Sequence, residues 1–299
     1  MPAAIDVILE PRTQDIGVPV RRLIPQRGHR QCGPFVFFDH MGPVEMAPGE
    51  GIDVRPHPHI GLATVTYLFE GAFMHRDSLG TVQRIEPGAV NWMSAGAGIV
   101  HSERSPDDLR ASGAVLHGIQ TWVALPQDDE QSAPWFRHYP AHEIPVVRRD
   151  GATLHVIAGD GFGARSPVQT ASRTFYVCAT LEAGASLVVP ADHVERGVYL
   201  VEGEITLDGT PLALHHAALL ARDARVELKA GPQGARTMLF GGDPLDGPRY
   251  IEWNFVASRR ELIEDAKHAW REQRFAKVPG ETEWIPLPGA APAERDAST

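Results

Sequence analysis

Short runs of alternating apolar and polar side chains recur along the 299-residue chain, separated by many of its 29 glycines and 25 prolines. In residues 64–69, for example, Val65, Tyr67 and Phe69 alternate with the side chains between them. Such a period of two gives an extended strand two distinct faces. An Asp150-Gly151 pair between two further apolar runs predicts a tight β-hairpin. The pattern as a whole predicts an all-β fold built from short strands.

An internal repeat divides the chain into two similar halves. The sequence YLFEG at residues 67–71 returns as YLVEG at residues 199–203. The repeat predicts two domains, an N-terminal barrel over residues 1–135 and a C-terminal barrel over residues 146–299. A stretch rich in proline and charge, residues 126–145, is the expected linker between them.

One helix is predicted near the C-terminus. Ser258 and Glu261 have the spacing of a capping box. An apolar stripe at helical spacing follows, formed by Leu262, Ala266, Ala269 and Trp270. The stripe could bind a partner, but packing against the helix's own barrel is the commoner outcome. The segment after Pro288 has no apolar period, and no regular structure is expected there.

Two pairs of metal-binding side chains stand out, His57-Pro58-His59 and His101-Ser102-Glu103. Residues two apart in a strand face the same way, so each pair can point at one centre. Three imidazoles and one carboxylate can hold a divalent metal ion. Histidines that are merely hydrogen-bonded in the structure are the alternative, but strand runs and glycine-rich turns flank both pairs, which favours the metal.

The second half of the chain lacks an equivalent set. At the offset of the repeat, His57 and His59 correspond to Val189 and Ala191. The other histidines there, His193, His215 and His216, form no second matched pair, so solvated or hydrogen-bonded roles are expected for them. We therefore expect one metal ion per chain, in the N-terminal barrel.

The sequence resembles the pirin family of bicupin proteins in a series of blocks that occur in the family's order. These are residues 20–22 (VRR), 33–40 (GPFVFFDH), 57–59 (HPH), 75–80 (HRDSLG), 92–96 (WMSAG), 101–103 (HSE) and 120–126 (QTWVALP). The match is dense in the first half and looser in the second. The resemblance implies two tandem cupin barrels, of the double-stranded β-helix or jelly-roll type, with a C-terminal helix.

The resemblance also implies a ligand set and a metal. The ligands carried over are His57, His59, His101 and Glu103. Pirins usually hold iron, so Fe(II) is expected, although Mn, Co, Ni, Cu or Zn would suit the same side chains. Four protein ligands leave an octahedral ion two positions for small molecules.

Two functions follow from the resemblance. Some pirins are similar in activity to quercetin 2,3-dioxygenase, which implies an oxygenase that cleaves a flavonol-like phenolic with O2, with Glu103 as both ligand and base. The alternative is a non-catalytic, metal-dependent interaction protein: a transcriptional co-regulator, a partner of a metabolic enzyme or a redox sensor. A cavity that opens to the metal favours the enzyme, and a sealed metal favours the interaction protein.

Further residues near the motifs are assigned weaker roles. Asp39, Val54 and Ile60 are expected to contact substrate, and His75 and Asp77 to orient the ligands from behind. Many pirins have charged residues where this chain has Ile60 and Ala63. That departure predicts a more apolar mouth for the pocket.

Bulk composition excludes several function classes. The formal net charge of −10 and a pI near 5.8 argue against direct binding to nucleic acid or to an anionic membrane. No run approaches the roughly 18 apolar residues of a membrane span, and the N-terminus lacks the pattern of a signal peptide. A cytoplasmic location is therefore expected. A monomer is also expected. Cys32 and Cys178 are expected as reduced thiols, because disulfides are rare in the cytosol.

Overall fold

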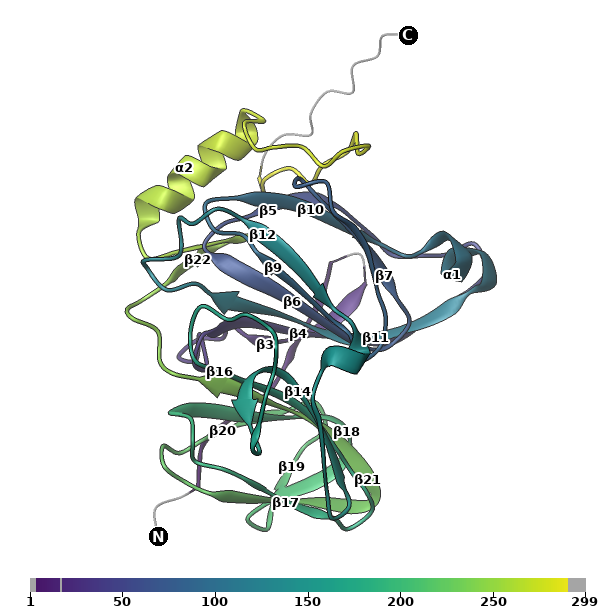
Figure 1. Ribbon diagram of the computed structural model, residues 1–299, viewed down its shortest axis with the longest axis vertical. Helices are drawn as coiled ribbons and strands as arrows, with labels where there is room; N and C mark the ends of the chain where they lie inside the picture. The colour runs from purple at the N-terminus through teal and green to yellow at the C-terminus, as the bar shows by residue number, and fades with distance from the viewer. Residues whose placement is uncertain (1–3, 17, 290–299) are drawn as a thin grey trace.

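Two β-barrels, one above the other along the long axis, make up the computed structural model, which describes residues 4–16 and 18–289 (Figure 1). The predicted all-β fold is confirmed. No helix in this part of the chain is long and apolar enough to cross a membrane. The expected monomer and cytoplasmic location stay predictions.

Two sheets form the upper barrel, counted over the described residues. The seven-stranded sheet has, in spatial order, β12 (Trp135–Tyr139), β9 (Val90–Ser94), β6 (Leu62–Glu70), β11 (Ala114–Ala124), β4 (Phe35–Met46), β3 (Pro19–Ile24) and β2 (Arg12–Asp15). The four-stranded sheet has β5 (Asp53–His59), β10 (Ile99–Arg104), β7 (Phe73–Asp77) and β8 (Val82–Ile85). A short helix, α1 (Asp107–Ser112), follows β10.

A ten-stranded sheet, again counted over the described residues, curls into the lower barrel. Its main path is β1 (Ile5–Leu9), β20 (Ala217–Leu220), β18 (Glu195–Leu207), β21 (Val226–Gly242), β16 (Thr174–Leu181), β14 (Ala152–Gly161) and β13 (Val146–Arg149). Off this path lie β15 (Ala164–Arg165), β17 (Ser186–Val189) and β19 (Thr210–Leu212), and the 3₁₀ turn η1 (Ala141–Glu143) precedes β13. The predicted hairpin is confirmed, because Arg149 pairs with Ala152 across Asp150-Gly151.

The two copies of the repeat occupy equivalent strands, β6 and β18. Tyr67 and Tyr199 are both buried in one apolar cluster between the barrels. Gly71 and Gly203, which end the copies, have φ of 81° and 80°, a left-handed conformation that favours glycine. The repeat therefore marks the same strand and turn in each barrel.

The cluster between the barrels also contains both cysteines. Cys32 and Cys178 are buried and free, as expected. Burial raises the pKa of the Cys178 thiol to about 12, so that thiol is protonated and packs as a small apolar group.

Strand pairing and helix packing differ from the domain boundaries drawn from the sequence in three places. β1 pairs with β20, so the N-terminal strand belongs to the C-terminal barrel. The strand β12 at residue 135 pairs with β9 and still belongs to the first barrel. The hairpin of β22 (Tyr250–Glu252) and β23 (Phe255–Ala257) and the helix α2 (Arg260–Arg271) cross back to the first barrel.

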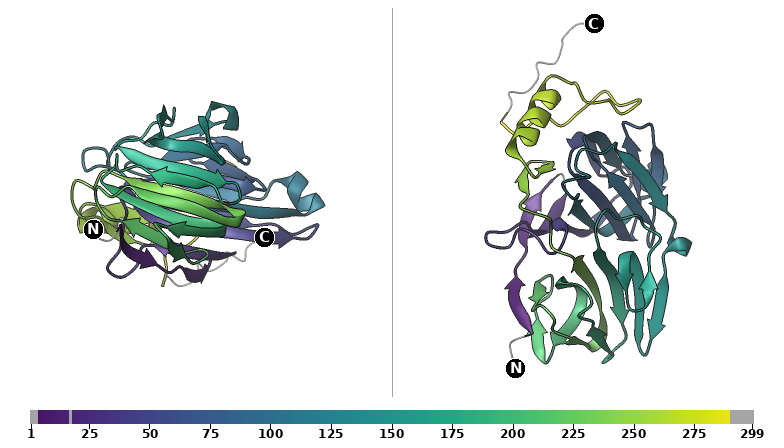
Figure 2. Two further views of the ribbon diagram at one scale, coloured as in Figure 1. Left: turned by 90° about the horizontal axis from the view of Figure 1, so that it is seen from below. Right: turned by 60° about the vertical axis from the view of Figure 1, so that its left-hand side comes forward.

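The helix α2 thus packs on the N-terminal barrel and not on its own. Its buried residues Ile263, Ala266 and Trp270 share a cluster with Ile60 and Val100 of the first barrel. Figure 2 shows the helix beside the upper barrel, away from the lower one. The tail predicted after Pro288 falls mostly on residues 290–299, outside the described residues.

The capping box predicted for this helix is wrong, although the helix itself is confirmed. The N-cap is Arg259, and no side chain caps the first turn. Ser258 instead donates from its hydroxyl to Glu130 Oε1 at 2.5 Å and from its backbone amide to Oε2 at 2.8 Å. Glu130 is only 3% exposed, so a buried carboxylate from the first barrel's connecting loop holds the start of the helix.

We expect Glu130→Ala to lower the free energy of unfolding by about 1–3 kcal/mol, because two donors of Ser258 lose their buried acceptor. Glu261→Gln, at the exposed position of the supposed capping box, should stay within about 0.5 kcal/mol of wild type. Urea denaturation measures both. A larger loss of unfolding free energy for Glu261→Gln than for Glu130→Ala would support the capping box.

Candidate metal centre

Three histidine side chains meet inside the first barrel. β5 supplies His57 and His59, β10 supplies His101, and antiparallel pairing sets His101 opposite His57. All three are buried, and one ring nitrogen of each lies within 4.8 Å of the other two. The Nε2 atoms of His59 and His101 are 3.2 Å apart. Within the described part of the chain, no other group of three or more potential ligands is this compact.

Hydrogen bonds behind two of the rings determine which nitrogen faces the centre. His57 Nδ1 donates to the carbonyl oxygen of Arg55 at 2.8 Å, and His59 Nδ1 donates to that of Asn254 at 3.0 Å. A carbonyl can only accept, so each Nδ1 carries the hydrogen and each Nε2 keeps a lone pair. Burial lowers the pKa of His57 to about 4 and that of His59 well below its usual value. Both rings are therefore neutral at pH 7, the state that binds a metal.

The third ring is oriented through a chain of two side chains. Asp77 Oδ1 accepts from the backbone amides of Leu79 and Thr81, and Oδ2 is 3.0 Å from His75 Nε2. Burial alone would raise the pKa of Asp77, but the hydrogen bonds from His75 and Thr81 hold it below its usual value. The ionised carboxylate makes His75 Nε2 a donor and leaves His75 Nδ1 to accept from His101 Nδ1, 3.4 Å away. His101 Nε2 is thus also free.

Three neutral imidazoles with free Nε2 atoms suit a divalent first-row metal ion. Glu103 lines the same cavity but stands outside the compact histidine group. A β-bulge separates it from His101 in the pairing with β5, and Thr66 donates its hydroxyl hydrogen to Glu103 Oε1 at 3.2 Å. Burial raises the pKa of the Glu103 carboxyl. The structure brings Glu103 to the site without fixing it as the fourth ligand.

A cavity of about 630 Å³ reaches the three histidines and Glu103. Asp39 and Val54 line it, as do several residues that sequence reasoning missed: Arg22, Phe37, Gln120, Trp122, Trp253, Asn254 and Ile285. Trp122 stacks on Phe37 with ring centroids 4.0 Å apart. The Arg22 guanidinium lies over the Phe37 ring, 4.3 Å from its centroid. Arg22 also donates two hydrogen bonds to Asp39, at 2.8 and 2.6 Å. The cavity therefore has one flat aromatic wall and one buried ion pair.

Some of the expected residues lie elsewhere. Ile60 does not line the cavity but is buried against Phe255 under helix α2. Ala63 faces the cluster between the barrels. Neither residue lines the cavity, because Ile60 forms an isolated bridge with Phe255 and Ala63 on β6 packs between the barrels. His40, in the same block as Asp39, faces the C-terminal barrel, where its ring nitrogens contact Tyr199 Oη and His117 Nε2, each at 2.8 Å.

The histidines of the second half have ordinary hydrogen-bonding roles. His193 donates from Nε2 to the carbonyl of Asp160 at 2.9 Å, and His216 from Nδ1 to that of Leu214 at 3.0 Å. Val189, which corresponds to His57, is buried in the apolar core of the lower barrel. The second barrel is filled by apolar side chains where the first has its ligands.

Comparison with known proteins gives matches along most of the chain. A family model described as Pirin matches residues 17–123, and the Pirin C-terminal cupin domain matches residues 176–276. The Pirin-like protein of Caulobacter vibrioides is 46% identical over 291 residues, which cover 95% of this chain and 99% of that protein.

Two solved structures extend the comparison. The crystal structure of a quercetin 2,3-dioxygenase from Acinetobacter baumannii superimposes with a TM-score of 0.89 at 33% identity, covering 97% of both chains. A bacterial pirin from Escherichia coli, solved in complex with nickel(II), gives a TM-score of 0.62 at 18% identity over 80% of this chain and 99% of that one. The second likeness shows the shared fold alone.

Removal of one imidazole should empty the site. We expect wild-type protein to bind close to one equivalent of divalent metal and His101→Ala to bind almost none, because two imidazoles hold an ion far more weakly than three. Elemental analysis of purified protein measures the stoichiometry. Two tightly bound equivalents in the wild type would contradict a single site.

The series of hydrogen bonds from Asp77 through His75 to His101 gives a separate prediction. Asp77→Asn can place an amide N–H toward His75, which favours the wrong tautomer of His101, so metal affinity should fall about 10–100-fold. Asp108→Asn, which changes an exposed carboxylate paired with Arg84, is the matched control. Titration against a coloured chelator measures both, and equal affinities for the two variants would rule out the orienting role.

Proposed function

The chain belongs to the pirin family, and on that premise we propose that it is a mononuclear metal oxygenase that opens a flavonol-like phenolic with O2. The observation that carries the proposal is a cavity that reaches three free imidazole nitrogens and the Glu103 carboxylate. The similarity to the Acinetobacter baumannii quercetin 2,3-dioxygenase supports the same reaction class.

The proposed metal ligands are His57, His59 and His101, with Glu103 as the fourth, and Fe(II) is the proposed ion. When bound, such an ion would act as a Lewis acid that makes a substrate hydroxyl group more acidic. A flavonol would contribute its adjacent hydroxyl and carbonyl oxygens. The overall reaction takes up one O2 and releases one carbon monoxide, leaving a depside.

Glu103 is proposed as the base that accepts the hydroxyl proton. A carboxylate that lines the cavity beside the proposed ion is placed to accept the proton of a phenolic hydroxyl group. The Thr66 hydroxyl, 3.2 Å from Oε1, holds the carboxylate in the cavity. Gln120 lies beside them, with its side-chain oxygen 2.9 Å from the same hydroxyl.

The stacked rings of Phe37 and Trp122 suit a planar substrate. Trp122 also contacts His59 edge to face, with centroids 5.1 Å apart, so this wall begins next to the proposed metal. An aromatic surface favours a flat ring system through offset stacking. The ion pair of Arg22 and Asp39 is the polar group available to hydroxyl groups at the other end of the substrate.

The interaction-protein alternative has less support. It predicts a sealed metal beneath an exposed apolar patch, whereas the cavity runs to the histidines through polar and apolar walls. The open cavity therefore favours the enzyme.

Glu103→Gln separates binding from catalysis. The variant should keep part of its metal, because an amide oxygen is a weaker ligand, and its turnover per bound metal should fall about 10²–10⁴-fold, because no base remains. Oxygen uptake and carbon monoxide release with quercetin, divided by metal content, measure this. Glu86→Gln, a change at an exposed carboxylate, is the control and should match wild type.

Absence of uptake above the free-metal background across a panel of flavonols, with metal bound to the wild type, would reject the oxygenase. The interaction protein would then be the preferred function.

A further inference from the structure

The segment that follows helix α2 runs back over the first barrel. Residues 277–287, here called the strap, lie above β5 and β10 (Figures 1 and 2). They follow the end of the second family match at residue 276. The strap therefore belongs to a part of this chain that the family models leave out.

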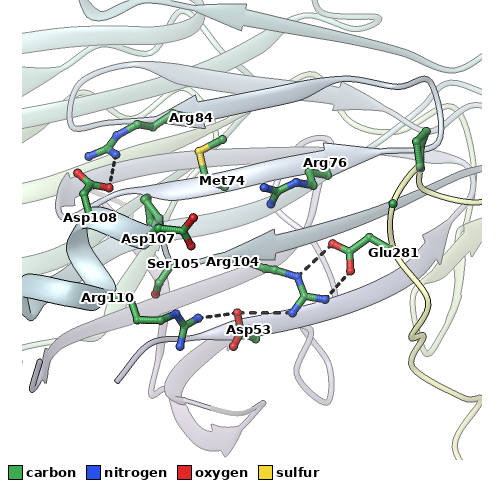
Figure 3. Close-up of a pocket in the computed structure, with 13 residues that line it drawn as sticks. Asp53, Met74, Arg76, Arg84, Arg104, Ser105, Asp107, Asp108, Arg110 and Glu281 are labelled. Carbon is green, nitrogen blue, oxygen red and sulfur yellow. Dashed lines mark hydrogen bonds and ion pairs between the residues drawn. The ribbon is translucent and has the colours of Figure 1, made fainter. Parts of the chain in front are cut away.

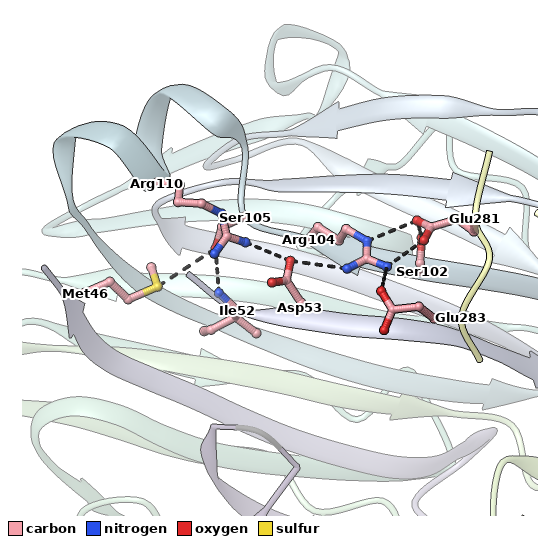
Figure 4. Close-up of polar contacts among 9 residues, drawn as sticks. All are labelled: Met46, Ile52, Asp53, Ser102, Arg104, Ser105, Arg110, Glu281 and Glu283. Carbon is pink, nitrogen blue, oxygen red and sulfur yellow. Dashed lines mark hydrogen bonds and ion pairs between the residues drawn. The ribbon is translucent and has the colours of Figure 1, made fainter. Parts of the chain in front are cut away.

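One set of strap contacts falls on β10, the strand of His101 and Glu103. Arg104 donates to both carboxylate oxygens of Glu281, at 3.0 and 2.5 Å, and Ser102 donates to Oε1 at 2.9 Å (Figure 4). The Arg104 and Glu281 side chains are only 20% and 11% exposed. Such a bidentate, partly buried pair is stronger than a surface ion pair.

A second set of contacts falls on β5, the strand of His57 and His59. The backbone amide of Ile285 donates to the carbonyl oxygen of Pro56 at 2.8 Å. Trp270 Nε1 of helix α2 donates to the Ile285 carbonyl at 3.0 Å. Val278 and Leu287, on either side, are buried in the helix cluster. The strap is thus attached next to the ligands on both ligand-bearing strands.

The Glu281 contact is one end of a longer chain of ion pairs. Asp53 accepts from Arg110 at 2.7 Å and lies 3.5 Å from Arg104, in a surface groove of about 670 Å³ (Figure 3). Among the described residues, Arg76 is the lining arginine without an acidic group within 4 Å. Four arginines and four acidic residues from the described segments line the groove, so its formal charges balance and it offers little to a free anion.

Ile285 gives the strap a place in the site itself. Its side chain lines the metal cavity together with Trp253, from the turn between β22 and β23. These two apolar side chains come from the C-terminal part of the chain, whereas the ligands come from the first barrel. Ile285 and Trp253 therefore lie in the same cavity as the histidines.

We propose that the strap controls access to the metal cavity, with Ile285 as a specificity-determining residue and Glu281 as the positioning residue that holds it. The identity of the substrate rests on the proposed function, but the control of access does not. Loss of the Glu281 contact frees the strap and exposes the cavity. A smaller residue at 285 widens the cavity while the strap stays attached, and it admits phenolics with bulkier ring substituents.

Two measurements on the full-length chain test the proposal. The first is the rate at which 4-(2-pyridylazo)resorcinol, a planar aromatic chelator, removes Ni(II) from the loaded protein. The second is the rate of trypsin cleavage after Lys277 under native conditions, which reports strap attachment without any metal. The test variants are Glu281→Gln, Ile285→Ala and the milder Ile285→Val.

Controls match each change in chemistry. Glu283→Gln alters a strap carboxylate that is 54% exposed. Its contact with Arg104 is 3.6 Å long, whereas that of Glu281 is 2.5 Å. Leu214→Ala removes a 49% exposed apolar side chain on the other barrel. Both should behave as wild type in both measurements.

Glu281→Gln should raise both rates, by about threefold or more, as expected when one charge-assisted contact that holds a local segment is lost. Ile285→Ala should raise the chelator rate and leave cleavage near wild type, with Ile285→Val between. Chelator rates for Glu281→Gln and Ile285→Ala equal to those of the controls would overturn control of access. Unchanged cleavage in Glu281→Gln would overturn the role of Glu281. Failure of the wild type to bind metal would reject the proposed function, while cleavage would still decide the role of Glu281.

Discussion

The alternation of side chains along β5 and β10 is the constraint on which the site depends. Inward positions carry His57, His59 and His101, and the outward positions of β10 carry Ser102 and Arg104, which hold the strap. Because side chains alternate between the two faces of a strand, a shift of one residue in β10 would displace both His101 and the residues that hold the strap. The ligand strands are therefore tied on one side to the metal cavity and on the other to the C-terminal segment.

Burial sets the chemistry of the ligands. Taking three imidazoles out of water disfavours their charged forms, and their mutual proximity adds to this in His59 and His101. Two backbone carbonyls and the His75–Asp77 pair then decide the tautomers. One of those carbonyls belongs to Asn254, far along the chain, so even the protonation pattern of the centre requires the C-terminal hairpin to be in place.

Local pattern made the strands and the two ligand pairs predictable, because each strand run and each pair lies within a few residues. The repeat was predictable because its two copies have almost the same five residues. The position of Ile60 could not be predicted in this way, because it follows the end of β5 and pairs with Phe255, which is 195 positions away in the sequence. The pairing of β1 with β20 and the contact of Ser258 with Glu130 join residues more than 100 positions apart. No local pattern of apolar and polar residues predicts these two contacts. Trp253 and Ile285 reach the cavity for the same non-local reason and carried no sequence signal.

The second barrel contributes to the site without supplying a ligand. Phe38 packs on Tyr199 and Phe240 of the lower barrel, with centroids 5.0 and 5.1 Å away, while its neighbours Phe37 and Asp39 face the cavity. The strand β4, which carries Phe37, therefore packs on its other face against the core between the barrels. Such closely packed cores resist the movement of their side chains. In the second copy of the repeat an apolar interior takes the place of the histidines. The strands that pack against the first barrel are present in both copies. The lower barrel therefore serves as a rigid support for the aromatic wall of the cavity.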